Sequence, residues 1–403
     1  MNAKRHAILF LIFLAILLIW RWSIAQDSSR RISKRYLEPA EKNPFPFEFQ
    51  VAALRDSEYM DAVISLINSA QRTIDVSMFM AQEPKGSSAL LLTALMNASR
   101  RGVRIRALFE DCVTDNFIWV SAINNCGGDA HLDDQNTKLH DKAIMIDDSL
   151  LIMGSHNWSN AALDKNKELS LILKSKPSAF IEWSKRFDVL FLQAQPFKID
   201  TTIPEIIVPI AMTVDNNQLS KIHYISCRGR IVMDGDYFDA FNTLVLASAH
   251  SINAGMYYVS PRAIGKGNLL DPIMTHIQSK IDSGMLMTVI MDQMNINQEG
   301  EAFHENQESM RVLLRMGINS SFDRSDQTHH VKCVVGDSEV FLTGSHNWTV
   351  ASIRFNKEVS FLGKSHEMGT VLTRYLKTLE NLTPIAQSDT TRKCRVEDLI
   401  TIH

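Results

Sequence analysis

Two short segments of this 403-residue chain contain the residue types that phosphodiester cleavage requires. Each has a histidine, a lysine two residues later and an aspartate seven residues after the histidine. A phosphodiester is attacked at phosphorus while its leaving oxygen gains a proton, so one imidazole must be neutral and another protonated. Two histidines with coupled titration meet both needs near neutral pH. We therefore expect catalytic groups in both segments: His140, Lys142 and Asp147, and His330, Lys332 and Asp337.

Further polar residues follow both segments at equal distances. Gly-Ser-His-Asn-Trp begins fourteen residues after each histidine, and Asn-Lys-Glu begins twelve residues beyond each of those glycines. Hydroxyl and amide donors, together with the two lysines, can stabilise the non-bridging phosphate oxygens, whose charge grows in the transition state. Either serine could also cap a helix. The side chains predicted to bind the substrate phosphate are Ser155, Asn157, Ser345 and Asn347.

The elements that position these residues can be inferred from apolar patterning. Residues 143–146 and 333–335 are apolar and predict strands, so the histidine and the lysine of each segment project from one face. Turn-forming residues and a second apolar run follow, which predicts two hairpins. Because Asp147 and Asp337 fall in these turns, we expect them to brace the hairpins more than to contact substrate.

The whole chain repeats itself. Residues 59–79 resemble 237–257 at an offset of 178, and the histidine segments match at an offset of 190. Alternating helix and strand signals predict an α/β fold, in which each unit is a mixed β-sheet flanked by helices. We expect two units, 46–199 and 222–381, joined by 200–221 and related by a pseudo-twofold axis with one shared active site. Residues 26–45 are then a linker, and 382–403 a C-terminal tail.

The paired His-x-Lys-x4-Asp segments, each followed by Gly-Ser-x-Asn, resemble the phospholipase D superfamily. This resemblance implies that His140 is the nucleophile, that His330 is the general acid, and that the reaction passes through a covalent phosphohistidine. It also implies that Glu168 and Glu358 orient an imidazole of their own or of the opposite unit. No cluster of acidic residues and histidines is evident near the motifs, so we expect no metal and no cofactor.

The N-terminus has the features of an export signal. Lys4 and Arg5 precede an apolar run from Ala7 to Trp20, and a small-residue cleavage pattern ends at Ala25. We expect residues 1–25 to be a signal peptide or a membrane anchor, which places the protein in the periplasm, the cell envelope or outside the cell.

Charge and composition bear on the substrate. The formal net charge is -3, and it becomes -6 if cleavage after Ala25 removes Lys4, Arg5 and Arg21. Such a body lacks the basic stripe that tracks a nucleic-acid backbone. We therefore expect a phospholipid substrate at a membrane surface and infer no obligate protein partner. An exported nuclease, a cardiolipin synthase-like transferase and a catalytically silent phosphate-binding membrane protein remain alternatives.

The five cysteines allow two interpretations. Cys333 lies in an apolar strand pattern and is expected to be buried. The others could pair as Cys112–Cys126 and Cys227–Cys394, or all could be free thiols.

Overall fold

The computed structural model describes residues 43–134, 136–196, 217–293, 301–323 and 327–380. The described residues from Phe45 onward form one compact body, which contains both predicted units. Residues 1–25, with the predicted signal or anchor, lie outside the described residues, as do most of the two predicted linkers and the tail. None of the described helices combines the length and the apolar character that crossing a bilayer requires.

The helices and strands of the two units follow one another in nearly the same order. The first unit contains β1 (Phe47–Arg55), α2 (Glu58–Ser69), β2 (Thr73–Met78), α3 (Ser87–Arg100), β3 (Arg104–Phe109), α4 (Asn116–Asn125), β4 (Asp129–Leu132), β5 (Lys142–Ile146), β6 (Leu150–Gly154), α5 (Asn160–Asp164), β7 (Leu169–Lys174), α6 (Ile181–Gln193) and β8 (Gln195–Pro196). The second contains α7 (Asn217–Lys221), β9 (Ile225–Met233), α8 (Tyr237–Ala247), β10 (Ser251–Met256), α9 (Pro261–Ile264), α10 (Asp271–Asp282), β11 (Leu286–Met291), α11 (Glu301–Arg315), β12 (Asn319–Phe322), β13 (Lys332–Gly336), β14 (Val340–Gly344), α12 (Val350–Arg354), β15 (Val359–Lys364) and α13 (His366–Lys377). Among the described residues, α7, which belongs to the predicted connection, α9 and β8 have no counterpart.

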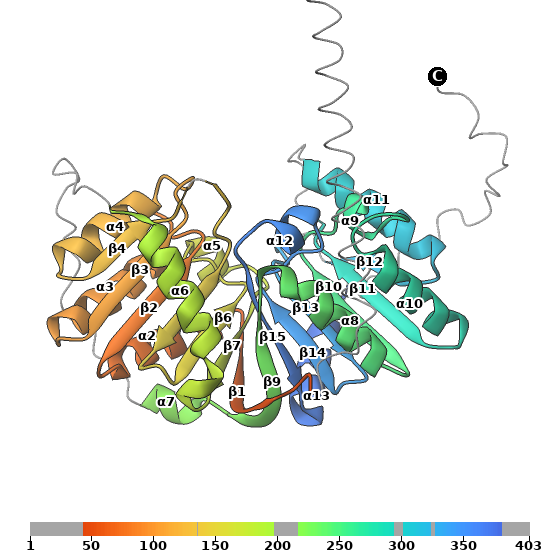
Figure 1. Cartoon of the computed structure of the whole chain (residues 1–403), viewed down its shortest axis with the longest axis horizontal. Helices are drawn as coiled ribbons and strands as arrows, with labels where there is room; N and C mark the ends of the chain where they lie inside the picture. Colours follow the sequence, from red (N-terminus) through yellow and green to blue (C-terminus); the bar gives the residue numbers. More distant parts are fainter. Residues whose placement is uncertain (1–42, 135, 197–216, 294–300, 324–326, 381–403) are drawn as a thin grey trace, which may run out of the picture. The chain divides into compact units, whose positions relative to one another are not determined.

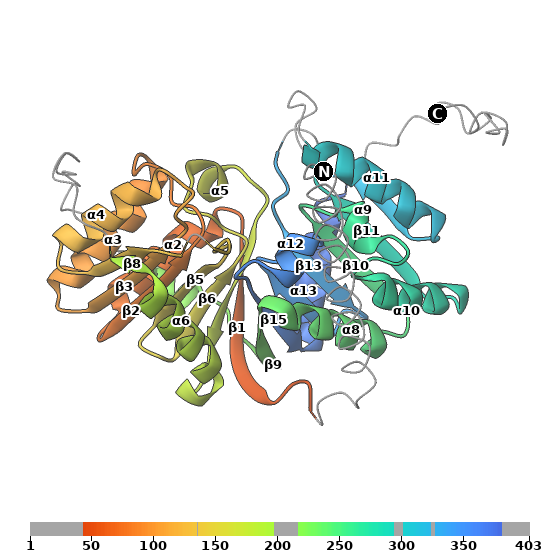
Figure 2. The same ribbon diagram turned by 45° about the horizontal axis from the view of Figure 1, so that its top comes forward.

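A single fifteen-stranded mixed sheet runs through both units in the order β12-β11-β10-β13-β14-β15-β9-β1-β7-β6-β5-β2-β3-β4-β8. Its centre is the antiparallel pair of β1 and β9, in register from Phe47 opposite Gly229 to Val51 opposite Ile225. Figure 2 shows these two strands side by side between the units. Outward from this pair, the strands of one unit match those of the other one by one, except that β8 at the edge of the first unit has no counterpart in the described part of the chain. Helices flank each half (Figure 1). The predicted α/β tandem duplication is therefore confirmed.

The predicted hairpins form for the expected reason. Asp147 and Asp148 adopt φ angles of 50° and 58°, and Asp337 and Ser338 adopt 51° and 52°. Short polar residues tolerate this left-handed conformation because their side chains can bond the local backbone. Every residue of β5 and of β13 is buried, so each hairpin lies deep in its half of the sheet.

The two units share a hydrophobic core. One buried cluster lies within the first unit and includes Ile67, Leu95 and Trp119. A second cluster combines residues of both units, among them Leu171 of β7 and Phe361 of β15. A core that contains side chains of both units fixes their relative position, so groups that meet at the junction can be held accurately.

The cysteines that the structure describes are free thiols. Cys112 is exposed, Cys126 is half-buried, and Cys227 and Cys333 are buried. The considered Cys112–Cys126 pair is therefore absent, and Cys394 lies outside the described residues. Burial raises the pKa of the Cys333 thiol to about 12, so it behaves as a small apolar side chain.

Candidate active site

The two predicted histidines lie where the units meet, each just before a central strand of its own unit. The backbone N–H of His140 donates to the carbonyl oxygen of Lys357 at 2.8 Å. In the same way, the N–H of His330 donates to the carbonyl oxygen of Lys167 at 2.8 Å. Each histidine is thus held by a segment of the opposite unit, at the same point of the repeat.

Each imidazole is oriented by a carboxylate of the other unit. His140 Nδ1 lies 2.8 Å from Glu358 Oε2, and His330 Nδ1 lies 3.0 Å from Glu168 Oε2. Both glutamates are fully buried. Because a carboxylate can only accept, each Nδ1 carries the hydrogen, and Nε2 is left as the reactive nitrogen. The resemblance left open which imidazole each glutamate would serve, and the structure places it opposite.

The lysines lie beside the histidines. Lys142 Nζ donates to the carbonyl oxygen of His140 at 2.7 Å, and Lys332 Nζ donates to that of His330 at 2.5 Å. Each ammonium group also lies over an aromatic ring, Phe79 at 4.8 Å and Tyr257 at 4.7 Å from the ring centre. Burial lowers the pKa of Lys142 to about 8 and that of Lys332 well below its usual value. Two desolvated cations without a full counter-charge favour an anionic ligand.

The electrostatics of the site couple the two units. Burial lowers the pKa of His140 well below its usual value, and the charges of Lys142 and Lys332 lower it further. Burial also lowers the pKa of His330, to about 4, although the Glu168 carboxylate opposes this. Burial would raise the pKa of Glu168, but the charge of His330 and the hydrogen bond to it hold that pKa at about 2. Both imidazoles are therefore neutral at pH 7 in the absence of ligand.

The two predicted serines have a different partner from the one expected. Ser155 Oγ donates to Glu168 Oε2, and Ser345 Oγ donates to Glu358 Oε2, each at 2.5 Å. Neither serine caps a helix, because α5 and α12 are capped by Ser159 and Thr349. The hydroxyls therefore hold the carboxylates in place, and their contact with the substrate phosphate stays a prediction.

The two predicted asparagines each have a side-chain oxygen that accepts no hydrogen bond from the described residues. Asn157 is half-buried and Asn347 is buried. The side-chain oxygen of each is buried without a hydrogen-bond partner in the described part of the chain. Buried polar atoms are normally satisfied, so these amides have hydrogen-bonding capacity to spare.

Asp147 and Asp337, predicted both among the catalytic groups and as braces of the hairpins, lie outside this group. Asp147 accepts the backbone N–H groups of Gln71, Arg72 and Thr73 at 2.7–2.9 Å. Asp337 accepts those of 249–251 in the same arrangement. Both follow the end of the strand that is remote from the histidine, and each ties its hairpin to the start of the neighbouring strand.

A buried ion network beside His140 was not foreseen. Arg186 of α6 donates to Asp141 at 2.7 Å and to Asp234 of the second unit at 2.8 Å. Asp141 is fully buried and also accepts the hydroxyl of Ser77. At the equivalent place beside His330, the Tyr375 hydroxyl donates to Asp56 Oδ1. Asp56 Oδ2 also lies 3.0 Å from Lys167 Nζ. Asp56 and Asp234 share the offset of 178, which is the sequence signal that could have identified them.

The histidines of the Gly-Ser-His-Asn-Trp segments are structural. His156 stacks on Tyr59, and its Nε2 donates to the Asp56 carbonyl oxygen at 3.0 Å. Its Nδ1 then accepts the Ser170 hydroxyl at 2.8 Å. His346 makes the same three contacts in the second unit. Both rings are fully buried and support the backbone next to the site.

Three carboxylates gather near the first motif, although the sequence suggested no such cluster. The side chains of Glu110, Asp111 and Asp133 each place an oxygen within 4.8 Å of the others. Glu110 accepts the N–H of Leu139, and Asp133 accepts that of Asp111. Burial and the charge of Glu110 raise the pKa of Asp133 to about 8. The residues follow β3 and β4, so only the sheet order brings them together.

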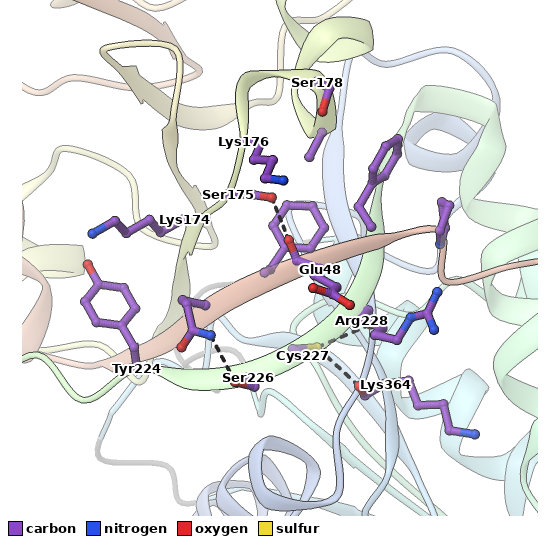
Figure 3. Close-up of a pocket in the computed structure, with 15 residues that line it drawn as sticks. Glu48, Lys174, Ser175, Lys176, Ser178, Tyr224, Ser226, Cys227, Arg228 and Lys364 are labelled. Carbon is purple, nitrogen blue, oxygen red and sulfur yellow. Dashed lines mark hydrogen bonds between the residues drawn. The ribbon is translucent and has the colours of Figure 1, made fainter.

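A large surface cavity lies away from these groups. It has a volume of about 1020 Å³ and is lined by residues such as Glu48, Lys176, Tyr224 and Arg228 (Figure 3). Lys174 and Lys364, also in its wall, end the two strands that begin next to Glu168 and Glu358. The cavity is thus at the far ends of the central strands and contains none of the predicted site residues.

Comparisons with known proteins agree with this architecture. The family described as "Cardiolipin synthase, PLD-like domain" matches residues 63–192 and 243–381. Cardiolipin synthase A of Citrobacter koseri is 22% identical over 330 residues, which are 78% of this chain and 65% of that protein. Phospholipase D of Rickettsia conorii is 33% identical over 94 residues, which are 23% of this chain and 47% of that protein. The chain therefore spans about two thirds and about half of these curated relatives.

A solved structure has the same fold. The crystal structure of phosphatidylserine synthase from Haemophilus influenzae Rd KW20 matches with a TM-score of 0.62 at 13% identity, over 84% of this chain and 88% of that chain. The family match covers both units, and the strands of each unit are arranged alike around one junction. The chain belongs to the phospholipase D superfamily, with its characteristic domain present twice.

Proposed function

We propose that this protein is a phosphodiesterase that hydrolyses a phospholipid through a covalent phosphohistidine. The observation that carries the proposal is the exchange of partners at the junction, where each buried glutamate of one unit holds the imidazole of the other. This arrangement leaves two reactive Nε2 atoms and two partly desolvated lysines around one junction, which suits an anionic substrate.

In the first step, Nε2 of His140 attacks phosphorus and forms a P–N bond. The P–O bond to the leaving alcohol breaks, and this oxygen takes a proton from Nε2 of His330. His330 must be protonated for this step. A bound phosphodiester anion supplies the missing charge, because it offsets the two lysines that lower the pKa of both imidazoles.

In the second step, water attacks the phosphohistidine. His330 accepts the proton of the water, the P–N bond breaks, and its electron pair returns to Nε2 of His140. The lysines hold the non-bridging oxygens in both transition states. The unpartnered side-chain oxygens of Asn157 and Asn347 are acceptors and suit a donor such as a substrate hydroxyl or water. The chain's own side chains supply every proton transfer in this scheme.

Transfer to an alcohol is the second candidate, and the similarity to cardiolipin synthase A over 78% of the chain favours it. The same intermediate would then be attacked by a hydroxyl of another lipid instead of water. An exported nuclease is a third candidate, but it has no comparable support in the charge of the chain.

We also propose that residues 1–25 direct the protein to the cell envelope, where they either are removed or anchor it. The support for this is the apolar run from Ala7 to Trp20 that follows Lys4 and Arg5. N-terminal sequencing of protein recovered from the envelope tests it, because an N-terminus at Gln26 indicates cleavage and one at Met1 indicates retention.

A substrate competition tests the proposed function. Full-length protein in neutral detergent is given phosphatidylcholine, phosphatidylglycerol and single-stranded DNA side by side, with and without glycerol as an acceptor. Release of phosphatidic acid supports hydrolysis, and glycerol-dependent formation of a new phosphatidyl ester indicates transfer. Preferential cleavage of DNA by orders of magnitude would overturn the lipid assignment, and the His140→Ala variant measures the background.

A further inference from the structure

Phe355 lies at the junction between the units, and its side chain is exposed. It is 61% exposed, and it directly follows α12, three residues before Glu358. Its backbone N–H donates to the carbonyl oxygen of Ala351 at 3.0 Å, so the end of the helix fixes its position. A single exposed apolar residue needs no explanation by itself, but the neighbours of Phe355 do.

Three cationic residues share this edge of the site. Arg354 and Lys138 are exposed, and Lys357 is half-buried. The N–H of Lys357 donates to the carbonyl oxygen of Lys138 at 2.8 Å, and its own carbonyl accepts the N–H of His140. Lys138 Nζ also lies 5.7 Å from the centre of the Phe79 ring, which packs against His140. These segments are therefore joined directly to the proposed nucleophile.

The matching edge beside His330 has the same backbone but different side chains. The N–H of Lys167 donates to the carbonyl oxygen of Thr328, and the carbonyl of Lys167 accepts the N–H of His330, both at 2.8 Å. Thr328, Asp164 and Lys165 stand where the first edge has Lys138, Arg354 and Phe355. The ammonium of Lys167 is paired with Asp56 at 3.0 Å. The backbone hydrogen bonds are the same at both edges. They therefore do not require the basic and aromatic side chains that are present at the first edge alone.

We propose that Lys138, Arg354, Phe355 and Lys357, called here the basic lip, seat this edge of the site on an anionic lipid bilayer. Phe355 inserts its ring between the lipids, and the three cations bind lipid phosphates. An aromatic ring next to lysine and arginine matches the membrane interface, where the ring meets the apolar boundary and the cations meet the anionic surface. The inference rests on the proposed function and adds how the enzyme approaches its substrate: with His140 toward the bilayer.

A direct test places a tryptophan at the two matched positions. The Phe355→Trp and Lys165→Trp variants of the full-length protein are reconstituted into vesicles of phosphatidylcholine and phosphatidylglycerol with brominated acyl chains, which quench nearby indoles. We expect the new indole of Phe355→Trp to lose at least half of its emission and that of Lys165→Trp to lose little. Equal quenching in the two variants, or none in Phe355→Trp, would overturn the proposal.

Kinetics separate this proposal from the proposed function. Phe355→Ser, which removes the ring without changing the charge, should raise the mole fraction of phosphatidylglycerol needed for half-maximal turnover by about tenfold, a change of about 1.4 kcal/mol at 298 K. Turnover of soluble bis(4-nitrophenyl) phosphate should stay within twofold, as it should in the matched Lys165→Ser variant. If the indole of Phe355→Trp is quenched but the wild type shows no lipid turnover, the proposed function fails and the lip stands. If lipid turnover is unchanged in Phe355→Ser, the lip fails and the function stands.

Discussion

The two halves of the site share one skeleton but differ in what supports it. Glu358, which holds His140, accepts the hydroxyls of both Ser345 and Ser352. Among the described residues, the carboxylate of Glu168, which holds His330, accepts a hydroxyl only from Ser155, because Ala162 stands where the second unit has Ser352. Both halves contain a histidine and a glutamate of the other unit that orients it, and the proposed reaction uses this pair twice. The contacts that differ between the halves suit the different roles proposed for the two imidazoles.

A second difference lies behind the histidines. The first unit buries Asp141, Ser77 and Arg186 as a hydrogen-bonded group. The counterparts of Asp141 and Ser77 in the second unit are Val331 and Gly255, and Leu376 and His329 lie against Gly255. Apolar packing thus replaces an ion pair at the same place of the fold, as buried pairs and apolar side chains can substitute for each other.

The largest effect should come from removing each histidine in turn. His140→Ala and His330→Ala should each lower turnover of phosphatidylglycerol by about 10³-fold or more, because one removes the nucleophile and the other the acid. With bis(4-nitrophenyl) phosphate, whose leaving group needs no proton, His330→Ala should keep more activity than His140→Ala. Equal losses with both substrates would contradict the assignment of the two roles.

Arg186 tests the buried ion network. Arg186→Met leaves Asp141 buried and unpaired, so we expect a loss of about 3–5 kcal/mol in the free energy of unfolding. Urea denaturation measures it. The double variant Asp141→Val with Arg186→Leu replaces the ion pair by apolar side chains and should recover part of the loss. A single variant as stable as the wild type would show that the network contributes nothing.

His329 makes the second unit sensitive to acid. Neither of its ring nitrogens has a partner among the described residues, and burial lowers its pKa to about 3. Below the unfolded pKa of 6.5, the unfolded chain therefore binds a proton that the folded chain refuses, so stability falls as pH falls from 6.5 toward 3. His329→Leu, which copies Leu139, should remove about 2 kcal/mol of this loss at pH 5.

Thermal unfolding at pH 5 and pH 8 checks this prediction. The melting temperature of the variant should exceed that of the wild type by a larger margin at pH 5 than at pH 8. A gain that is the same at both pH values would mean that packing, and not protonation, explains the effect.

Ser352 tests the extra support of Glu358. Its hydroxyl donates to Glu358 Oε1 at 2.6 Å and accepts the N–H of Asn347 at 2.9 Å. Ser352→Ala should lower kcat about fivefold, the equivalent of one hydrogen bond of about 1 kcal/mol, with little change in KM. Ser352→Thr should restore part of it. Ala162→Ser is the matched variant in the first unit, and a similar fall in kcat there would contradict the distinction.

The smallest effect is expected from removing metal ions. The first unit has Glu110, Asp111 and Asp133, whereas Gln293 stands in the second unit where the first has Asp111. We expect excess chelator to leave turnover within twofold, since the proposed steps use side chains alone. Loss of activity in chelator, with recovery on adding a divalent cation, would make the acidic cluster a metal site that distinguishes the units.

The sequence predicts the fold and the central residues well because they occur twice. Repetition at fixed offsets identifies His140, His330, Lys142 and Lys332, and it predicts the tandem α/β architecture. It cannot show that Glu358 serves His140, because this depends on how the β1–β9 pair joins the units. The turn chemistry after each strand does indicate that Asp147 braces its hairpin, and its bonds to the backbone of residues 71–73 agree.

Residues that occur once are the hardest to find. Asp141 has the apolar counterpart Val331, and Arg186 is matched by Tyr375, which makes the equivalent contact to Asp56, so identity of residues gives no signal for either. Ser155 and Ser345 are predicted to bind phosphate because a hydroxyl can donate a hydrogen bond to it. In the structure each hydroxyl donates to a carboxylate of its own unit. Burial at the junction decides such contacts, and it depends on the tertiary structure.

The exchange of glutamates has a consequence for how such a protein can be rearranged. A unit excised from this chain would keep an imidazole but lose the carboxylate that orients it. It could regain a working centre only by pairing with another copy of itself. In that homodimer the two edges of the active site would have identical side chains, so neither edge could be preferred for contact with a surface. A single chain with two diverged units allows the two edges to differ.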